Sequence, residues 1–150
     1  MFNKDFREFV GLLNSIGVTY LIVGGYARAA YGHPRYTGDL NIWIRREPEN
    51  VGKLLKALSS FGFGGLGLVS SDFLVPGQVV QLGYPPSRID LLTSIDGVDF
   101  DTCHSSRMMV AIDGSELPFI GLKDFRTNKR ASGRPKDLVD LATLDDGNQP

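Results

Sequence analysis

The feature that most constrains the fold is a short apolar run that leads directly into two glycines. Residues 19–23 (TYLIV) are apolar and rich in β-forming side chains, which is typical of a buried strand. Gly24 and Gly25 follow at once, and the next residues, YARAAYG, predict a helix. Glycine lets the backbone approach a ligand closely, and free N–H groups at a helix start can bind phosphate oxygens. A tight strand-to-helix turn also uses glycine for steric reasons alone, so both interpretations stay open.

Two later segments carry polar side chains on predicted strands. The run DLNIWIR alternates polar and apolar residues from Asp39 onward, which predicts a half-buried strand with Asp39 and Asn41 on one face. The run RIDLLT predicts another strand, with Asp90 between bulky aliphatic residues. A buried unpaired carboxylate is costly, so we expect Asp90 to bind a metal ion, to pair with Arg88, or both. Three oxygen ligands on one face of neighbouring strands would suit Mg²⁺. Without a metal ion, Asp39 would only cap a strand end.

The remaining pattern predicts one α/β unit, in which a mixed sheet is flanked by helices. We expect a single domain over residues 1–145 and a frayed tail over 146–150. Helices are expected at 3–16, 48–61, 121–131 and 135–144, a further strand at 78–82, a hairpin from 106–112 and 116–120, and a loop at 62–77 with a helical turn at 71–74.

The overall charge of the chain is nearly balanced. Its 150 residues include 16 Lys and Arg against 17 Asp and Glu, for a net charge of −1, which argues against a general nucleic-acid binder. The charge is unevenly distributed, however. From Lys123 to Lys136 there are six basic residues and one acid, Asp124, so this basic segment carries 6 − 1 = +5 and the rest −6. From charge alone, a solvated helix face is favoured over an anion site.

Composition excludes several other classes of site. The chain has one cysteine, Cys103, so it forms no internal disulfide. One cysteine and two histidines are also too few ligands for a structural zinc site of the Cys/His type. No apolar run approaches the roughly 20 residues of a membrane span, and the N-terminus carries acids, so we expect a cytoplasmic protein with no membrane partner.

Two motifs do not carry the chemistry that they suggest. The stretch from Gly62 to Gly67 matches G-x-G-x-x-G, but a dinucleotide fingerprint requires a preceding strand, and here a helix precedes it. Cys103 and His104 are adjacent, so their side chains point apart and do not form a nucleophile–base pair.

Taken together, these segments resemble the nucleotidyltransferase superfamily, which has the polymerase-β-like fold. The run VGGYARAAYGHPRYTGDLNIWI is similar to the family signature: a hydrophobic residue, two small residues, a spacer, and an Asp-x-Asp pair on the next strand. Asp90 matches the third carboxylate on a later strand. The C-terminal FIGLKDFRTNKRASGRPKDLVDLATL resembles small bacterial members, including relatives of AbiEii-type toxins. The resemblance covers residues 18–145.

The resemblance implies an active site with two Mg²⁺ ions, which Mn²⁺ could replace. Asp39 and Asn41 would bind both ions, and Asp90 the ion that activates the nucleophile. Gly24 and Gly25 would hold the triphosphate through backbone contacts. The expected reaction moves a nucleoside monophosphate from a nucleoside triphosphate to a hydroxyl on a polymer, such as tRNA.

The basic segment would then contact phosphate. We expect Lys129 to bind the triphosphate, with Arg130 and Arg134 behind it. Asp137 and Asp140 lie one helical turn apart, so they either orient these cations or simply solvate the helix. An RNA acceptor would be bound by this segment and by the surface around Arg35 and Tyr36, or by a second subunit. The resemblance to toxin-type relatives also implies an antitoxin as a partner.

The chain departs from the family pattern at Asn41, where a second Asp is expected. An amide oxygen can bind Mg²⁺ but contributes no negative charge, so catalysis should be weaker. The residue could be an engineered substitution, belong to a slow natural enzyme, or mark a nucleotide-binding or regulatory module of toxin–antitoxin type. A phosphotransferase acting on a small molecule such as an aminoglycoside is a further alternative.

Overall fold

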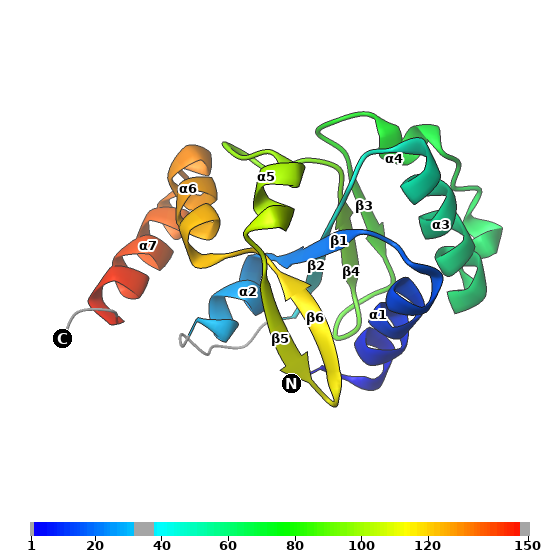
Figure 1. The fold of residues 1–150 in the computed structure, drawn as a ribbon, viewed down its shortest axis with the longest axis horizontal. Helices are drawn as coiled ribbons and strands as arrows, with labels where there is room; N and C mark the ends of the chain where they lie inside the picture. Colours follow the sequence, from blue (N-terminus) through cyan, green and yellow to red (C-terminus); the bar gives the residue numbers. More distant parts are fainter. Residues whose placement is uncertain (1, 32–37, 148–150) are drawn as a thin grey trace.

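The computed structural model describes residues 2–31 and 38–147, with side chains through Ala142 (Figure 1). Its elements in chain order are α1 (Lys4–Ile16), β1 (Tyr20–Val23), α2 (Gly24–Ala30), β2 (Leu40–Ile44), α3 (Pro48–Leu58), the π-helical turn η1 (Ser59–Phe63), the 3₁₀ turn η2 (Gly64–Leu66), α4 (Ser71–Leu74), β3 (Val79–Leu82), β4 (Ile89–Leu92), α5 (Phe100–Ser105), β5 (Met108–Ile112), β6 (Ser115–Phe119), α6 (Leu122–Ser132) and α7 (Pro135–Gly147).

The strands form one mixed six-stranded sheet in the order β3-β4-β2-β1-β6-β5. The pairs β2/β4 and β1/β6 are parallel, and the other three pairs are antiparallel. The expected α+β architecture with a mixed sheet is therefore confirmed. The register places Asn41 opposite Asp90 on one side and opposite Val23 on the other.

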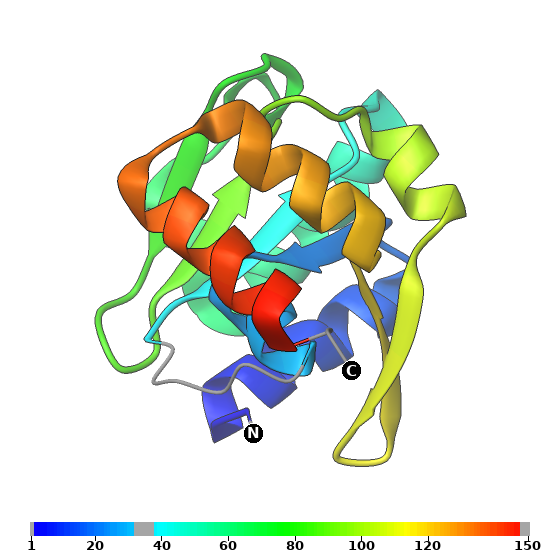
Figure 2. The same cartoon turned by 90° about the vertical axis from the view of Figure 1, so that its left-hand side faces the viewer.

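Helices cover both faces of the sheet. In the two views, α1 and α3 lie on one side of the central strands, and α6 and α7 lie on the other (Figures 1 and 2). The alternation in β2 explains this arrangement: Leu40, Ile42 and Ile44 are fully buried in one hydrophobic cluster with Phe6 and Phe9 of α1. The residues between them face the opposite layer, so the side chain of Asn41 lies on the α6 side of the sheet.

The helix ends follow the expected capping chemistry. Asn3 caps α1, since its side chain accepts a hydrogen bond of 2.9 Å from the Phe6 N–H, and Gly17 ends the helix in the left-handed region at φ 85°. Glu47 caps α3 in the same way, with Pro48 at the first helical position.

Several elements differ from the sequence-based expectation. A short helix, α5, occupies a stretch for which no element was predicted, with Asp99 capping it through the Thr102 N–H. The helix after β1 begins two residues earlier than expected, at Gly24 itself. α7 continues through Gly147, and residues 148–150 of the expected tail lie outside the described part.

The two motifs that were set aside have no catalytic geometry. The glycine-rich stretch forms η1 and η2 directly after α3, so no strand precedes it. Cys103 is fully buried in α5, and burial raises the pKa of its thiol to about 12. His104 stacks on the ring of Phe100. Among the described residues, no helix is both long and apolar enough to cross a membrane.

Candidate functional site

The turn between β1 and α2 packs directly against β2. Gly24 has φ +71°, a backbone conformation that side chains rarely tolerate. A Cβ added there would lie 3.1 Å from both Cβ and Cγ of Asn41, and closer still to its amide nitrogen. Only glycine fits this position, which supports the steric interpretation of Gly24. Gly25 lies in the first turn of α2 and shows no positive φ.

Asn41 presents an unsatisfied acceptor at the centre of the site. Its amide oxygen Oδ1 is buried and has no hydrogen-bond partner among the described residues. A buried polar atom without a partner carries a desolvation cost of about 1–3 kcal/mol. Such an atom therefore marks a position where a bound group would be stabilised.

Asp39 and Asp90 are bridged by one guanidinium, that of Arg88. Its Nη2 donates to Oδ2 of Asp39 at 2.5 Å and to Oδ2 of Asp90 at 3.2 Å, and its Nε donates to Oδ1 of Asp90 at 3.1 Å. Burial raises the pKa of Asp90, while the Arg88 contacts oppose that rise. Arg88 pairs not only with Asp90 but also with Asp39, which the sequence-based alternative left unpaired.

These residues fit one divalent ion better than two. The described part of the chain holds no group of three His, Cys, Asp or Glu side chains that could bind a metal ion. A carboxylate offers about four lone-pair positions, so Asp39 and Asp90 can accept a further partner beside Arg88. Asn41 lies on β2, two residues after Asp39 and directly opposite Asp90, and its amide oxygen can supply a third oxygen ligand. Mg²⁺ needs only one or two carboxylates when substrate phosphates and water complete its shell.

A pocket of about 300 Å³ opens beside Asn41, between β2, β4 and α6. It brings Gly24 and Asn41 together with two of the expected phosphate-binding residues, Lys129 and Arg134. Arg130 does not line it. The sequence-based analysis missed the rest of the lining: Val23, Leu92, Ser94, Ile95, Asp96, Asn128 and Ser132.

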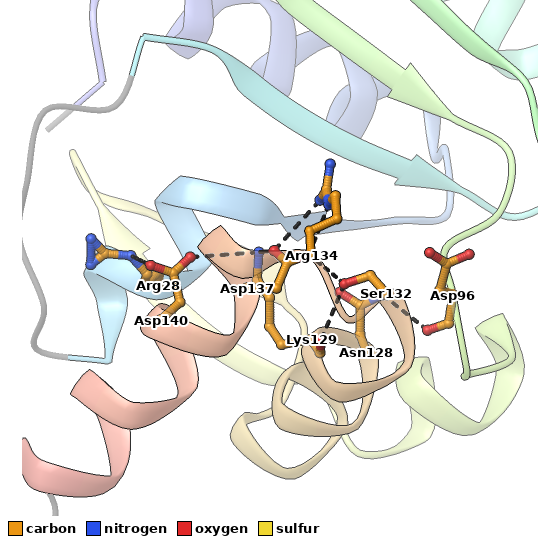
Figure 3. Close-up of polar contacts among 8 residues, drawn as sticks. All are labelled: Arg28, Asp96, Asn128, Lys129, Ser132, Arg134, Asp137 and Asp140. Carbon is orange, nitrogen blue, oxygen red and sulfur yellow. Dashed lines mark hydrogen bonds and ion pairs between the residues drawn. The ribbon is translucent and has the colours of Figure 1, made fainter.

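A buried ionic network stands behind this pocket (Figure 3). The carboxylate of Asp137 is completely buried and accepts hydrogen bonds from Lys129 at 3.0 Å, Ser132 at 2.5 Å and Arg134 at 2.8 Å. Asp140, also buried, lies 3.4 Å from Arg28 of α2 and 3.8 Å from Lys129. The hypothesis that these acids orient the basic groups is supported, and the hypothesis that they solvate the helix is wrong.

The contacts of Asp137 and Asp140 determine whether Lys129 or Arg134 is accessible to a ligand in the pocket. Burial opposes ionisation of Asp137, but the bonds from Arg134, Ser132 and Lys129 outweigh it and hold the pKa of this carboxyl well below its usual range. Two carboxylates thus surround the Lys129 ammonium, and only 12% of its side chain is exposed. The Arg134 side chain is 72% exposed. Arg134, rather than Lys129, is the cation that the pocket offers.

A second pocket, of about 390 Å³, adjoins the first, and Ser94 lines both. Trp43 and half-buried Phe100 contribute aromatic rings to it. Its charged lining residues are Arg45, Arg46, Glu47, Asp99 and Asp101. No sequence motif indicated this pocket, because its lining comes from three separate segments. Arg35 and Tyr36, the other residues expected to contact an acceptor, lie outside the described residues.

No protein-family model matches this chain, and no curated protein matches it. Among solved structures, the chain is similar to the crystal structure of a "putative nucleotidyltransferase" from Thermotoga maritima. The TM-score is 0.63 at 15% sequence identity, over 95% of this chain and 91% of the other. The fold is of the nucleotidyltransferase type. At 15% identity, this structural similarity establishes the fold alone. The resemblance to AbiEii-type toxins stays a prediction.

Proposed function

We propose that this chain is a nucleotidyltransferase that moves a nucleoside monophosphate from a nucleoside triphosphate to a hydroxyl acceptor. The observation that carries the proposal is that Gly24 packs against Asn41 and that Asn41 lies opposite Asp90 on the neighbouring strand. Gly24 and Asn41 line a pocket together with Arg134. Their order along the chain matches the resemblance on which the sequence-based expectation rests, and so do their positions: Gly24 begins α2 directly after β1, and Asn41 and Asp90 lie on β2 and β4. The shared fold supports the same conclusion.

The triphosphate would occupy the pocket between β2 and α6. Gly24 allows the backbone to come close to it, and Arg134 supplies an exposed guanidinium that suits phosphate geometry. Lys129 contributes through its hold on Asp137, which also orients Arg134. Lys129 is therefore a positioning residue in this proposal and not the main phosphate ligand.

Asp39, Asp90 and the amide oxygen of Asn41 would hold Mg²⁺ or Mn²⁺. When bound, the ion would offset negative charge on the α-phosphate and on the attacking oxygen. The acceptor oxygen forms a bond to the α-phosphorus, the bond from that phosphorus to the bridging oxygen of the β-phosphate breaks, and pyrophosphate leaves. The hydroxyl proton passes to water. Asn41 and Arg88 both reduce the negative charge available to an ion here, so we expect slow turnover.

RNA is the acceptor that we propose. Lys123, Arg130 and Lys136 of the basic segment are exposed along α6 and α7, where they can contact a phosphate backbone. The neighbouring pocket adds two arginines and the half-buried ring of Phe100, which suit a terminal nucleotide.

A binding or regulatory module without turnover is the second candidate, and the bridged carboxylates favour it specifically. The discriminating experiment incubates the chain with nucleoside triphosphates labelled at the α-phosphate, Mg²⁺ and total RNA. Label on RNA that disappears with Asp39→Ala supports the enzyme. Nucleotide binding without label on RNA supports the module. A phosphotransferase would move the γ-phosphate instead, so in a parallel incubation with triphosphate labelled at that position, label on a small molecule supports the phosphotransferase alternative. Asp113→Asn, at an exposed acid paired with Arg7 and outside the two pockets described above, is the matched control.

A further inference from the structure

We propose that the guanidinium of Arg88 takes the place of a second metal ion, so that the site binds one divalent cation per chain. This inference deepens the proposed function and rests on it for the identity of the bound nucleotide. It concerns the charge arrangement built by Asp39, Asn41, Arg88 and Asp90.

Arg88 occupies the position between the two carboxylates. Three hydrogen bonds of 2.5, 3.1 and 3.2 Å connect its fork to both acids, although Asp39 is 49 residues away in sequence. The three side chains are mostly shielded from solvent, with exposed fractions of 34% for Asp39, 30% for Arg88 and 11% for Asp90. A guanidinium is planar and presents its N–H groups as a rigid fork, so one side chain can bridge both carboxylates.

The formal charges of the site leave room for one divalent ion. Asp39 and Asp90 contribute −2, Asn41 contributes none, and Arg88 brings the sum to −1. Three carboxylates, as in the family pattern, would contribute −3, so this site carries two fewer negative charges, which is the charge of one divalent ion, whatever the triphosphate adds. Like charges a few ångströms apart repel strongly where water is largely excluded. The missing carboxylate at position 41 and the guanidinium of Arg88 therefore both reduce the negative charge that is available to bind metal ions.

The test counts bound ions directly. The intact chain is saturated with an ATP analogue whose α,β bridge resists cleavage, and Mn²⁺ is titrated with detection by calorimetry and electron paramagnetic resonance. We expect one Mn²⁺ per wild-type chain and an uncoupled spectrum. Arg88→Gln should bind a second Mn²⁺, with the spin coupling of two ions about 3.5–4 Å apart. Arg88→Lys keeps the positive charge and should stay at one ion.

Each outcome bears on the inference. Two ions, or none, on the wild-type chain overturn it even if Arg88→Gln fails to fold, and one ion on folded Arg88→Gln overturns it as well. Arg7→Gln, at an arginine paired with Asp113 and outside both pockets, should leave the count at one. The count does not depend on turnover. A chain that binds one Mn²⁺ with the analogue but labels no acceptor would refute the proposed function and leave the role of Arg88 standing.

Discussion

Gly24 and Asn41 pack so closely that no other residue than glycine fits at position 24. The backbone of Gly24 lies at φ +71°, and a Cβ there would fall 3.1 Å from two side-chain carbons of Asn41. The contact joins the start of α2, directly after β1, to strand β2, and Asn41 lies opposite Asp90 of β4. One glycine thus sets the positions of the polar side chains on two strands.

Gly24→Ala should damage both stability and nucleotide binding. The strained backbone conformation alone costs about 1–3 kcal/mol, and the clash would push the Asn41 side chain away from the pocket. Urea unfolding measures the first effect, and titration with a fluorescent nucleotide measures the second. Gly52→Ala is the matched control, because nothing lies within 4 Å of its new Cβ. In mid-helix it should stabilise the chain by about 0.5–1 kcal/mol, and equal effects of the two variants would refute the account of Gly24.

Asp137→Asn should destabilise the chain by about 3–5 kcal/mol, since it leaves the buried ammonium of Lys129 without its closest partner. Thermal and urea unfolding measure this loss. Asp101→Asn, at an exposed ion pair, should change stability by less than about 0.5 kcal/mol.

The carboxyl of Asp137 should also make the free energy of unfolding depend on pH. The pKa of Asp137 is lower in the folded chain than in the unfolded one, so its contribution is complete above an unfolded value of about 4 and is lost as pH falls below it. Urea unfolding between pH 7 and pH 3 should show this loss in the wild-type chain and a smaller loss in Asp137→Asn. Parallel curves for the two chains would contradict the assignment.

Arg134→Gln should weaken binding of a nucleoside triphosphate by about tenfold or more, because a hydrogen bond to a charged group contributes about 1.5–3 kcal/mol. Arg130→Gln removes a neighbouring cation that does not line the pocket and should change affinity much less. Calorimetric titration at fixed salt compares the two variants. A larger loss with Arg130→Gln would place the triphosphate elsewhere.

Asn41→Asp should increase Mg²⁺-dependent transfer by about tenfold or more, since it adds a charged ligand at a buried oxygen that lacks a partner. The rate of label transfer at limiting Mg²⁺ measures the gain, in an assay where Asp39→Ala removes activity. No gain over the wild-type chain would show that the amide is not what limits the site.

Local signals in the sequence predicted most of the fold. The cap at Asn3, the alternation from Asp39 and the hairpin around Gly114 each depend on neighbouring residues, and each element lies within a few residues of its expected place. The helix α5 was missed because its six residues are too few to show a helical period, although Asp99 three residues before Thr102 is a capping signal.

The site was harder to predict because its decisive contacts join distant residues. Alternation put Asp39, Asn41 and Asp90 on one face, but nothing local indicated that Arg88 reaches Asp39. Lys129 and Arg134 were both expected at phosphate, and only the fold shows that two buried acids neutralise Lys129. Burial of Asp137 depends on the packing of α7 against α6, which charge patterning does not reveal.

A crystal structure of the chain with Mg²⁺ and a non-hydrolysable nucleoside triphosphate tests the central claim most directly. We predict the triphosphate against Gly24 and Arg134, with a single ion bound by Asp39 and Asp90 beside the amide of Asn41. A nucleotide bound away from Gly24, or no ion at these carboxylates under saturating Mg²⁺, would contradict the account.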